Sequence, residues 1–236
     1  MADFPNRLLK ALSSSDAAAL QPHLRSVQLR QKKILYETGQ PITLVYFPTG
    51  AVISLVVNLS SGASVEAAMV GLDGVVGASA ALNGRKSLNQ AVVQLAGSSL
   101  ICEVGDLASI ALQSVNMLST LIRHEQALFV QAQQSAACMS SHTVEARLCR
   151  WLLRGRDLSG SDTLDFTQEF LAEMLGAQRT SVTLSAQTLQ EAGLIEYKRG
   201  KIRILDANRM REAVCECYQA VKDQYAEIGA PSDQRR

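Results

Sequence analysis

The hydrophobic pattern of this chain changes abruptly near residue 105. Before that point short apolar segments alternate with glycines, whereas the stretch from Asp106 to His142 contains neither glycine nor proline. Short apolar segments separated by glycine turns are typical of a β-sandwich or small barrel, and a long periodic stretch without such breakers is typical of a helix. The pattern therefore predicts an α+β chain with a β-rich first part and a mainly helical remainder.

Seven apolar segments are predicted as strands, and a helical pattern over residues 6–26 precedes them. The predicted strands are Val27–Leu29, Ile34–Tyr36, Leu44–Phe47, Val52–Val57, Val65–Val70, Ala91–Leu95 and Leu100–Val104. Many short strands of this kind bury a core as two stacked sheets or as a small barrel.

The composition limits the classes of partner that this chain can have. The 236 residues are 47% hydrophobic and 19% charged, which is typical of a globular protein. The net charge is only +1, so nucleic acid would have to be bound by a local basic patch. No apolar run reaches the roughly 18 residues of a membrane helix, and the first residues lack the pattern of a secretory signal. We expect a cytoplasmic protein with no membrane partner.

Cysteine and histidine usage bears on metal sites and on catalysis. The five cysteines are odd in number and scattered, which argues against a disulfide framework. We interpret them as buried small apolar residues, Cys215 and Cys217 included, because residues two apart on a helix do not share a face. No histidine lies between residues 24 and 123, where a cupin-type metalloenzyme would need ligands. We predict that the protein is not an enzyme and binds no metal or cofactor.

Apolar residues recur seven apart along the stretch from Asp106 to His142. Because residues i and i+7 share a helix face, these rows form a long apolar stripe that must be buried. The stripe can pack on its own domain or against a parallel helix of a second chain. The pattern favours the homodimer, although Glu125 interrupts a third row. The residues predicted to form the dimer contact are Leu118, Leu121, Ile122, Leu128, Phe129 and Ala132.

Residues 166–195 carry the pattern of two short helices joined by a tight turn. Thr167 can cap a first helix that runs through Met174, and Gly176 fits the left-handed position that ends it. A second helix is predicted over about residues 178–191. The apolar residues that face inward are Leu171, Met174, Leu175, Val182, Ala186 and Leu189. This pattern predicts a helix–turn–helix.

A predicted β-hairpin around Gly200 follows the second helix, so the whole unit is a winged helix–turn–helix. The N-terminus of the second helix presents backbone N–H groups and partial positive charge, which suit a phosphate. Arg179 can pair with guanine, and Gln178 with adenine. Between Gly176 and Leu205 five basic residues stand against two acidic ones, which makes this patch positive.

This layout resembles the Crp/Fnr (catabolite-activator/FNR) family of bacterial transcription regulators over about residues 20–206. The most specific segments are Thr167-Gln168-Glu169, Gly176-x-x-Arg179-x-x-Val182 and Leu189-x-x-x-Gly193-Leu194-Ile195. The resemblance implies four parts. They are a cyclic-nucleotide-binding-like β-roll (a double-stranded β-helix, or jelly roll) over 1–105, a dimerisation helix over 106–142, the winged helix–turn–helix over 143–208, and a C-terminal helix and tail over 209–236.

The resemblance also assigns roles to single residues. It implies that Arg179 takes the position of the arginine that reads a base in this family. Thr180 stands where many members have glutamate, and Leu184 where a second polar contact is common. We therefore expect an operator that differs from the best-known consensus of the family. The residues predicted to contact DNA are Thr167, Gln178, Arg179, Thr180, Ser181, Thr183, Lys198, Arg199, Lys201 and Arg203.

The effector of the β-roll is not evident from its sequence. Cyclic-nucleotide-binding members place a glutamate and a nearby arginine on the cyclic phosphate, but no glutamate follows Gly77 here, and Gln90 lies near the arginine position. A phosphate buried without a cation would be costly. The candidate effector residues are Gly77, Arg85, Gln90 and Ala91. We do not expect cyclic AMP as the effector. The chain has no cysteine cluster near its N-terminus that would indicate an iron–sulfur sensor, and no cysteine pair that would indicate a redox sensor.

Together these observations predict a sequence-specific DNA-binding transcription regulator. It would read palindromic double-stranded DNA as a homodimer and act together with RNA polymerase. Two alternatives stay open: a cyclic-nucleotide-responsive regulator, and a regulatory module that acts through protein contacts.

Overall fold

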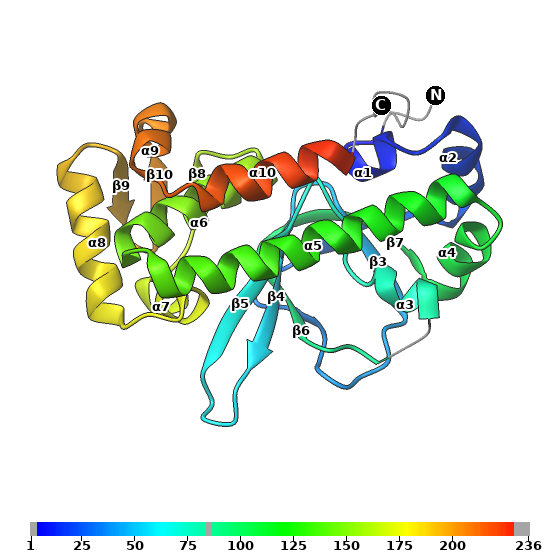
Figure 1. The fold of residues 1–236 in the computed structure, drawn as a ribbon, viewed down its shortest axis with the longest axis horizontal. Coiled ribbons are helices and arrows are strands. Elements are labelled where there is room, and N and C mark those ends of the chain that lie inside the picture. The colour runs from blue at the N-terminus through cyan, green and yellow to red at the C-terminus, as the bar shows by residue number, and fades with distance from the viewer. Residues whose placement is uncertain (1–3, 84–85, 229–236) are drawn as a thin grey trace.

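A long helix, α5 (Val115–Ser141), crosses the molecule. The computed structural model describes residues 4–83 and 86–228. In Figure 1 the β-rich part lies below α5, and the helix–turn–helix part lies beyond the C-terminal end of α5. A last helix, α10 (Cys217–Ile228), runs alongside α5.

The β-rich part consists of two antiparallel sheets with strand orders β1-β7-β3 and β2-β6-β4-β5. The strands are β1 (Arg25–Leu29), β2 (Ile34–Tyr36), β3 (Leu44–Pro48), β4 (Val52–Asn58), β5 (Ser64–Val70), β6 (Gln90–Leu95) and β7 (Gly97–Glu103). All seven predicted segments coincide with strands, because their β-branched residues fill a pleated surface with glycines at its turns. The predicted mixed α+β class is confirmed.

Short helices border these sheets. They are α1 (Arg7–Lys10), α2 (Ser14–Leu20), the 3₁₀ helix Gln21–His23, and α3 (Ala78–Asn83). The first of them is fixed by Asn6, a fully buried residue whose Oδ1 accepts from the amides of Leu8 and Leu9 and whose Nδ2 donates to Pro48 O and Gly74 O. The N-terminal helical segment is thereby anchored to the β-roll.

The stretch after Asp106 forms two helices where the sequence predicts one continuous helix. α4 (Val104–Ala111) ends before α5 starts, and the residues between them form a turn. Ser114 caps α5, because its hydroxyl accepts from the amide of Met117 at 3.2 Å. A serine side chain satisfies a free amide at a helix start, so the break needs no glycine or proline.

The C-terminal half contains a second small sheet with strand order β8-β10-β9. Its elements are α6 (Val144–Ser159), β8 (Thr163–Asp165), α7 (Gln168–Leu175), α8 (Arg179–Glu191), β9 (Ile195–Lys198), β10 (Lys201–Ile204) and α9 (Ala207–Ala213). Thr143 caps α6 through the amide of Ala146, and Gly160 ends it at φ +70°. The only element of this sheet absent from the sequence prediction is β8.

One hydrophobic cluster extends from the C-terminal half into the β-roll. Val52, Val56 and Met69 of the β-roll belong to the same buried cluster as the helix–turn–helix residues. A Cβ on Gly71 would lie 2.6 Å from the Cβ of Leu158 in α6, so only glycine permits this close approach. The two parts are therefore packed directly against each other.

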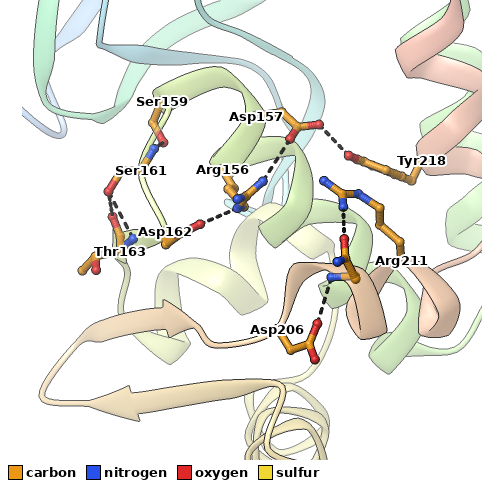
Figure 2. Close-up of polar contacts among 10 residues, drawn as sticks. Arg156, Asp157, Ser159, Ser161, Asp162, Thr163, Asp206, Arg211 and Tyr218 are labelled. Carbon is orange, nitrogen blue, oxygen red and sulfur yellow. Dashed lines mark hydrogen bonds and ion pairs between the residues drawn. The ribbon is translucent and has the colours of Figure 1, made fainter.

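The residues after Ala207 form α9 and α10, where the sequence indicates one helix-like stretch. Asp206 caps α9 by accepting from the amides of Asn208 and Arg209. Figure 2 shows the contact that joins α10 to the end of α6: the Tyr218 hydroxyl donates to Asp157 Oδ2 at 2.5 Å. This C-terminal segment is thus an integral part of the fold.

Candidate nucleic-acid interface

The first helix of the helix–turn–helix, α7, starts and ends as its sequence predicts. Thr167 caps it, with its hydroxyl accepting from the amide of Phe170 at 3.2 Å. Gly176 ends it at φ +56°, the left-handed conformation that glycine adopts without strain. Leu171, Met174 and Leu175 are buried as expected.

The second helix, α8, buries one face and exposes the other. Val182, Ala186 and Leu189 are at most 3% exposed and hold the helix on the core. Arg179 and Thr180 are exposed at its first turn, together with Leu184 one turn later. Gln178 precedes the helix without capping it by a side-chain hydrogen bond, so the first amides carry no such cap. The N-terminal end of α8 is therefore open to a ligand.

Two of the predicted DNA-contact residues on α8 are less exposed to solvent than the others. Ser181 is partly buried. The Thr183 hydroxyl lies 2.9 Å from both Gln168 Oε1 and the carbonyl oxygen of Arg179. This hydroxyl connects α7 to α8 and is turned toward the protein.

The hairpin of β9 and β10 projects beside α8, with its turn at Arg199 and Gly200. Both turn residues have positive φ, +51° and +78°, as a two-residue hairpin turn requires. Tyr197 fixes the hairpin to α8 and to the start of α7, because its amide donates to Gln190 Oε1 and its hydroxyl to Phe166 O. Burial raises the pKa of Tyr197, which keeps this phenol neutral.

The basic residues of the hairpin fall into two groups. Lys198 and Arg199 are exposed near its tip. Lys201 lies 3.5 Å from Asp165, and Arg203 lies 2.9 Å from Glu196. All four of these paired groups are about half exposed or more, so the ion pairs are weak and a phosphate can compete for the cations.

The predicted dimer residues on α5 divide by burial. Ile122 and Phe129 are 43% and 64% exposed, and Leu118 and Ala132 are half-buried. Leu121, in contrast, is 1% exposed and packs in the core of its own chain, so its assignment to a dimer contact is wrong. Leu128 also packs inward, against the β-roll. The outward row is Val115, Ile122 and Phe129.

A cavity of about 260 Å³ lies between the β-roll, α3 and α5. Gly77 lines it at φ +89°, and its other lining residues include Tyr36, Lys86 and Glu125. Of the other candidate effector residues, Ala91 is buried in the sheet core, and Gln90 points elsewhere because its amide donates to Glu37 Oε2 at 2.7 Å. Arg85 lies outside the described residues.

Sequence reasoning missed one cluster near the end of α5. All five cysteines are buried, as expected, but Cys138, Cys215 and Cys217 converge with His142. The interpretation of Cys215 and Cys217 as diverging helical residues is wrong, because Cys215 lies in the link before α10 starts. The spacing Cys138-x-x-x-His142, one turn apart on a predicted helix, was the available signal.

The histidine of α5, His124, lies inside the protein. His124 is fully buried, and its Nε2 accepts from the amide of Val75 at 3.1 Å, which makes it a structural residue of α5. Among the described residues, no helix is both long enough and apolar enough to span a membrane.

Comparisons with known proteins agree with this geometry. Residues 146–213 match the Crp-like helix-turn-helix domain family. No curated protein matches the chain in sequence.

Several solved structures share the fold over most of their length. FixK2 from Bradyrhizobium japonicum has a TM-score of 0.69 at 16% identity, over 81% of this chain and 98% of that one. The c-di-GMP responsive global regulator CLP from Xanthomonas campestris has 0.63 at 13%, over 82% and 100%. TTHB099, a CRP-family transcriptional regulator from Thermus thermophilus, has 0.64 at 18%, over 79% and 95%.

Both parts of the chain thus lead to the same assignment. The β-roll, α5 and the C-terminal half follow the fold of these regulators, and the helix–turn–helix matches the Crp-like domain in sequence. Residues 146–213 therefore belong to the Crp-like helix-turn-helix domain family, and the chain as a whole has the fold of solved structures that include a CRP-family transcriptional regulator.

Proposed function

We propose that this protein is a DNA-binding transcription regulator of the Crp/Fnr type. It binds an inverted-repeat operator as a homodimer, with α8 of each chain in the major groove. The observation that carries the proposal is the open first turn of α8, where Arg179 and Thr180 are exposed on a helix whose other face is buried. A helix held this way presents its N-terminal side chains to base edges. Arg179 is assigned the guanine contact, since a guanidinium pairs with guanine O6 and N7.

The remaining contacts are divided between bases and phosphates. Gln178, Thr180 and Ser181 are assigned to base edges or the nearest phosphate, and the uncapped amides of α8 suit a phosphate oxygen. The exposed Leu184 supplies an apolar contact that fits a thymine methyl group. Thr167 lies at the start of α7, where a phosphate contact is expected.

The hairpin is assigned to the phosphate backbone. Lys198 and Arg199 at its tip are exposed, and Lys201 and Arg203 exchange weak protein ion pairs for phosphate when DNA is bound. Such contacts add affinity without sequence preference and make binding strongly dependent on salt.

The dimer is assigned to the outward row of α5. Val115, Ile122 and Phe129 are 83%, 43% and 64% exposed and lie seven residues apart, so they form one apolar stripe along the helix. A parallel copy of the same stripe buries it by coiled-coil packing. This arrangement brings two copies of α8 to the same side of the dimer, where they can read two half-sites.

The cavity beneath α5 is the proposed effector site, and cyclic AMP is not the proposed effector. The Glu125 carboxylate lines this cavity and would repel a phosphate. Lys86 is the single basic residue that lines it among the described residues. Thermal unfolding measured with cyclic AMP, cyclic GMP and cyclic di-GMP tests this point. No stabilisation is expected, and a rise in the melting temperature with cyclic AMP would contradict it.

The regulator is proposed to act in the cytoplasm, where it would contact RNA polymerase at promoters. Binding of the full chain to labelled genomic fragments, competed with random duplex, tests the proposal as a whole. We expect fragments that resist competition, each holding two chains. Equal competition at every fragment would instead favour a module that acts through protein contacts alone.

A further inference from the structure

Three cysteines and one histidine meet where α5 ends and the C-terminal helix begins. Cys138 lies in the last turn of α5 and His142 directly follows that helix, while Cys215 comes from the link before α10 and Cys217 is the first residue of α10. One possible ligand atom from each of the four residues lies within 4.8 Å of all the others. The two pairs are far apart in sequence, so the tertiary fold alone brings them together.

Two separations between the possible ligand atoms fit a tetrahedral metal centre. Cys138 Sγ lies 3.6 Å from Cys215 Sγ, and Cys217 Sγ lies 3.5 Å from His142 Nδ1. Zinc bonds of about 2.3 Å to sulfur and about 2.0 Å to nitrogen place tetrahedral ligand atoms about 3.8 Å and about 3.5 Å apart. The ligands therefore need to move little to enclose an ion of this size.

Two neighbouring side chains, Glu216 and Gln134, contact members of the cluster as residues around a bound metal do. His142 Nε2 lies 3.3 Å from the Glu216 carboxylate, an arrangement that directs Nδ1 toward the three sulfur atoms. Gln134 Nε2 donates to Cys217 Sγ at 3.1 Å, as an amide does to a metal-bound thiolate. His142 is partly exposed and Glu216 is exposed, so an ion can reach the site from solvent.

Apolar packing alone explains this cluster poorly. Its buried members are only the three cysteines, with Ala146 and Val214 against them. Three small side chains bury little apolar area for a junction that joins α5, α6 and α10. A metal ion bound here would add a strong link at the start of α10, next to the apolar packing that its later residues make.

We propose that Cys138, His142, Cys215 and Cys217 bind one zinc ion, which fastens the C-terminal helix to the junction between α5 and the DNA-binding domain. A donor set of three thiolates and one imidazole without an open position is that of a structural zinc site. His142 is the residue at which the chain leaves α5, at φ −113° and ψ 151°, before Thr143 starts α6. The ion therefore fixes the direction in which the DNA-binding domain leaves the dimer helix.

The first test is the zinc content of the full chain, purified under reducing conditions. One zinc per chain is expected for the wild type and for the controls Cys102→Ala and Cys149→Ala, since these cysteines are buried outside the cluster. Cys215→Ser and Cys217→Ser are expected to lose the ion. Glu216→Ala is expected to retain it with about tenfold weaker affinity, as for other outer-shell changes. Full zinc content in Cys217→Ser would overturn the proposal.

A second test needs no variant and does not depend on folding of a mutant. Cobalt(II) added to the zinc-free wild-type chain should give the visible bands of a tetrahedral ion and a thiolate charge-transfer band, both saturating at one equivalent. A spectrum without thiolate bands, or a Cys138–Cys215 disulfide found in a chain that takes up no metal, would refute the zinc site. Neither readout involves DNA, so the outcome of these tests does not depend on whether the proposed operator binding is correct.

Discussion

Asp73 of the β-roll and Arg154 of α6 form an ion pair, with 2.6 Å between Oδ2 and Nη1. Both side chains are at most 10% exposed, and the Arg154 guanidinium also lies 4.5 Å from the centre of the Tyr225 ring in α10. One arginine thus joins the β-roll, the helix α6 of the C-terminal half and the C-terminal helix. The Gly71-x-Asp73-Gly74 segment therefore serves as a docking element, in which Gly71 admits Leu158 and Asp73 holds Arg154.

Replacing Asp73 with asparagine should destabilise the whole protein. The change leaves the Arg154 charge buried without its partner, which costs about 3–5 kcal/mol for pairs of this kind. Unfolding in urea measures the loss. The control is Glu103→Gln, which breaks an exposed pair with Arg25 and should cost at most about 1 kcal/mol. Equal stability of the two variants would contradict the role of the buried pair.

Glu66 should make stability depend on pH. It is buried beside Ser54, Gln94 and Trp151, and burial raises its pKa from 4.5 to about 7. The Ser54 hydroxyl has one hydrogen but lies 2.5 Å from Glu66 Oε2 and 2.7 Å from Gln94 Oε1. A protonated Glu66 that donates to Ser54 resolves this conflict, while its Oε1 accepts from Trp151 Nε1 at 3.1 Å.

The sign of the effect follows from the raised pKa. As pH rises from about 4.5 to about 7, the unfolded chain releases the Glu66 proton and the folded chain retains it, so stability falls by up to about 3 kcal/mol and then levels off. Glu66→Gln keeps the hydrogen bonds without the charge and should remove this slope. Urea midpoints across this pH range measure it, and an unchanged slope in the variant would exclude Glu66 as its source.

The stripe on α5 predicts a specific effect on assembly. Phe129→Glu places two carboxylates at the proposed contact between the helices and should convert a dimer into a monomer in sedimentation equilibrium. Leu59→Glu, at an exposed apolar position between β4 and β5, serves as the control and should remain dimeric. A Phe129→Glu protein that stays dimeric would rule out this face.

Arg179 and Lys198 should differ in how their loss affects DNA binding. Arg179→Ala should cost about 1–3 kcal/mol on the specific site and relax preference at one base pair, because it removes a base contact. Lys198→Ala should weaken specific and random duplexes alike and reduce the salt slope by about one. Fluorescence anisotropy at several salt concentrations separates the two, and equal loss on both duplexes for Arg179→Ala would contradict base reading.

Local signals made the helix–turn–helix and the strands predictable. Thr167, Gly176 and Gly200 each specify a cap or a turn through their own chemistry, and they occur where the structure has these features. The alternation of apolar segments with glycine likewise indicated every strand of the β-roll.

Contacts between residues far apart in the chain could not be predicted from the sequence in the same way. The heptad rows of α5 could not distinguish Leu121, which faces the core, from Phe129, which faces outward, because both are apolar at helical spacing. The convergence of Cys138 with Cys215 depends on the path of α9 and α10, and the pairing of Asp73 with Arg154 depends on how two domains dock. No spacing in the sequence encodes either contact.

Selection of bound duplexes from a random pool tests the central claim most directly. If two copies of α8 read DNA together, the recovered sequences should form an inverted repeat whose half-site centres lie about one helical turn, roughly 34 Å, apart. The same selection with Arg179→Ala should lose preference at one symmetric position. Recovery of sequences without a shared motif, or of a single half-site without its inverted copy, would contradict the account.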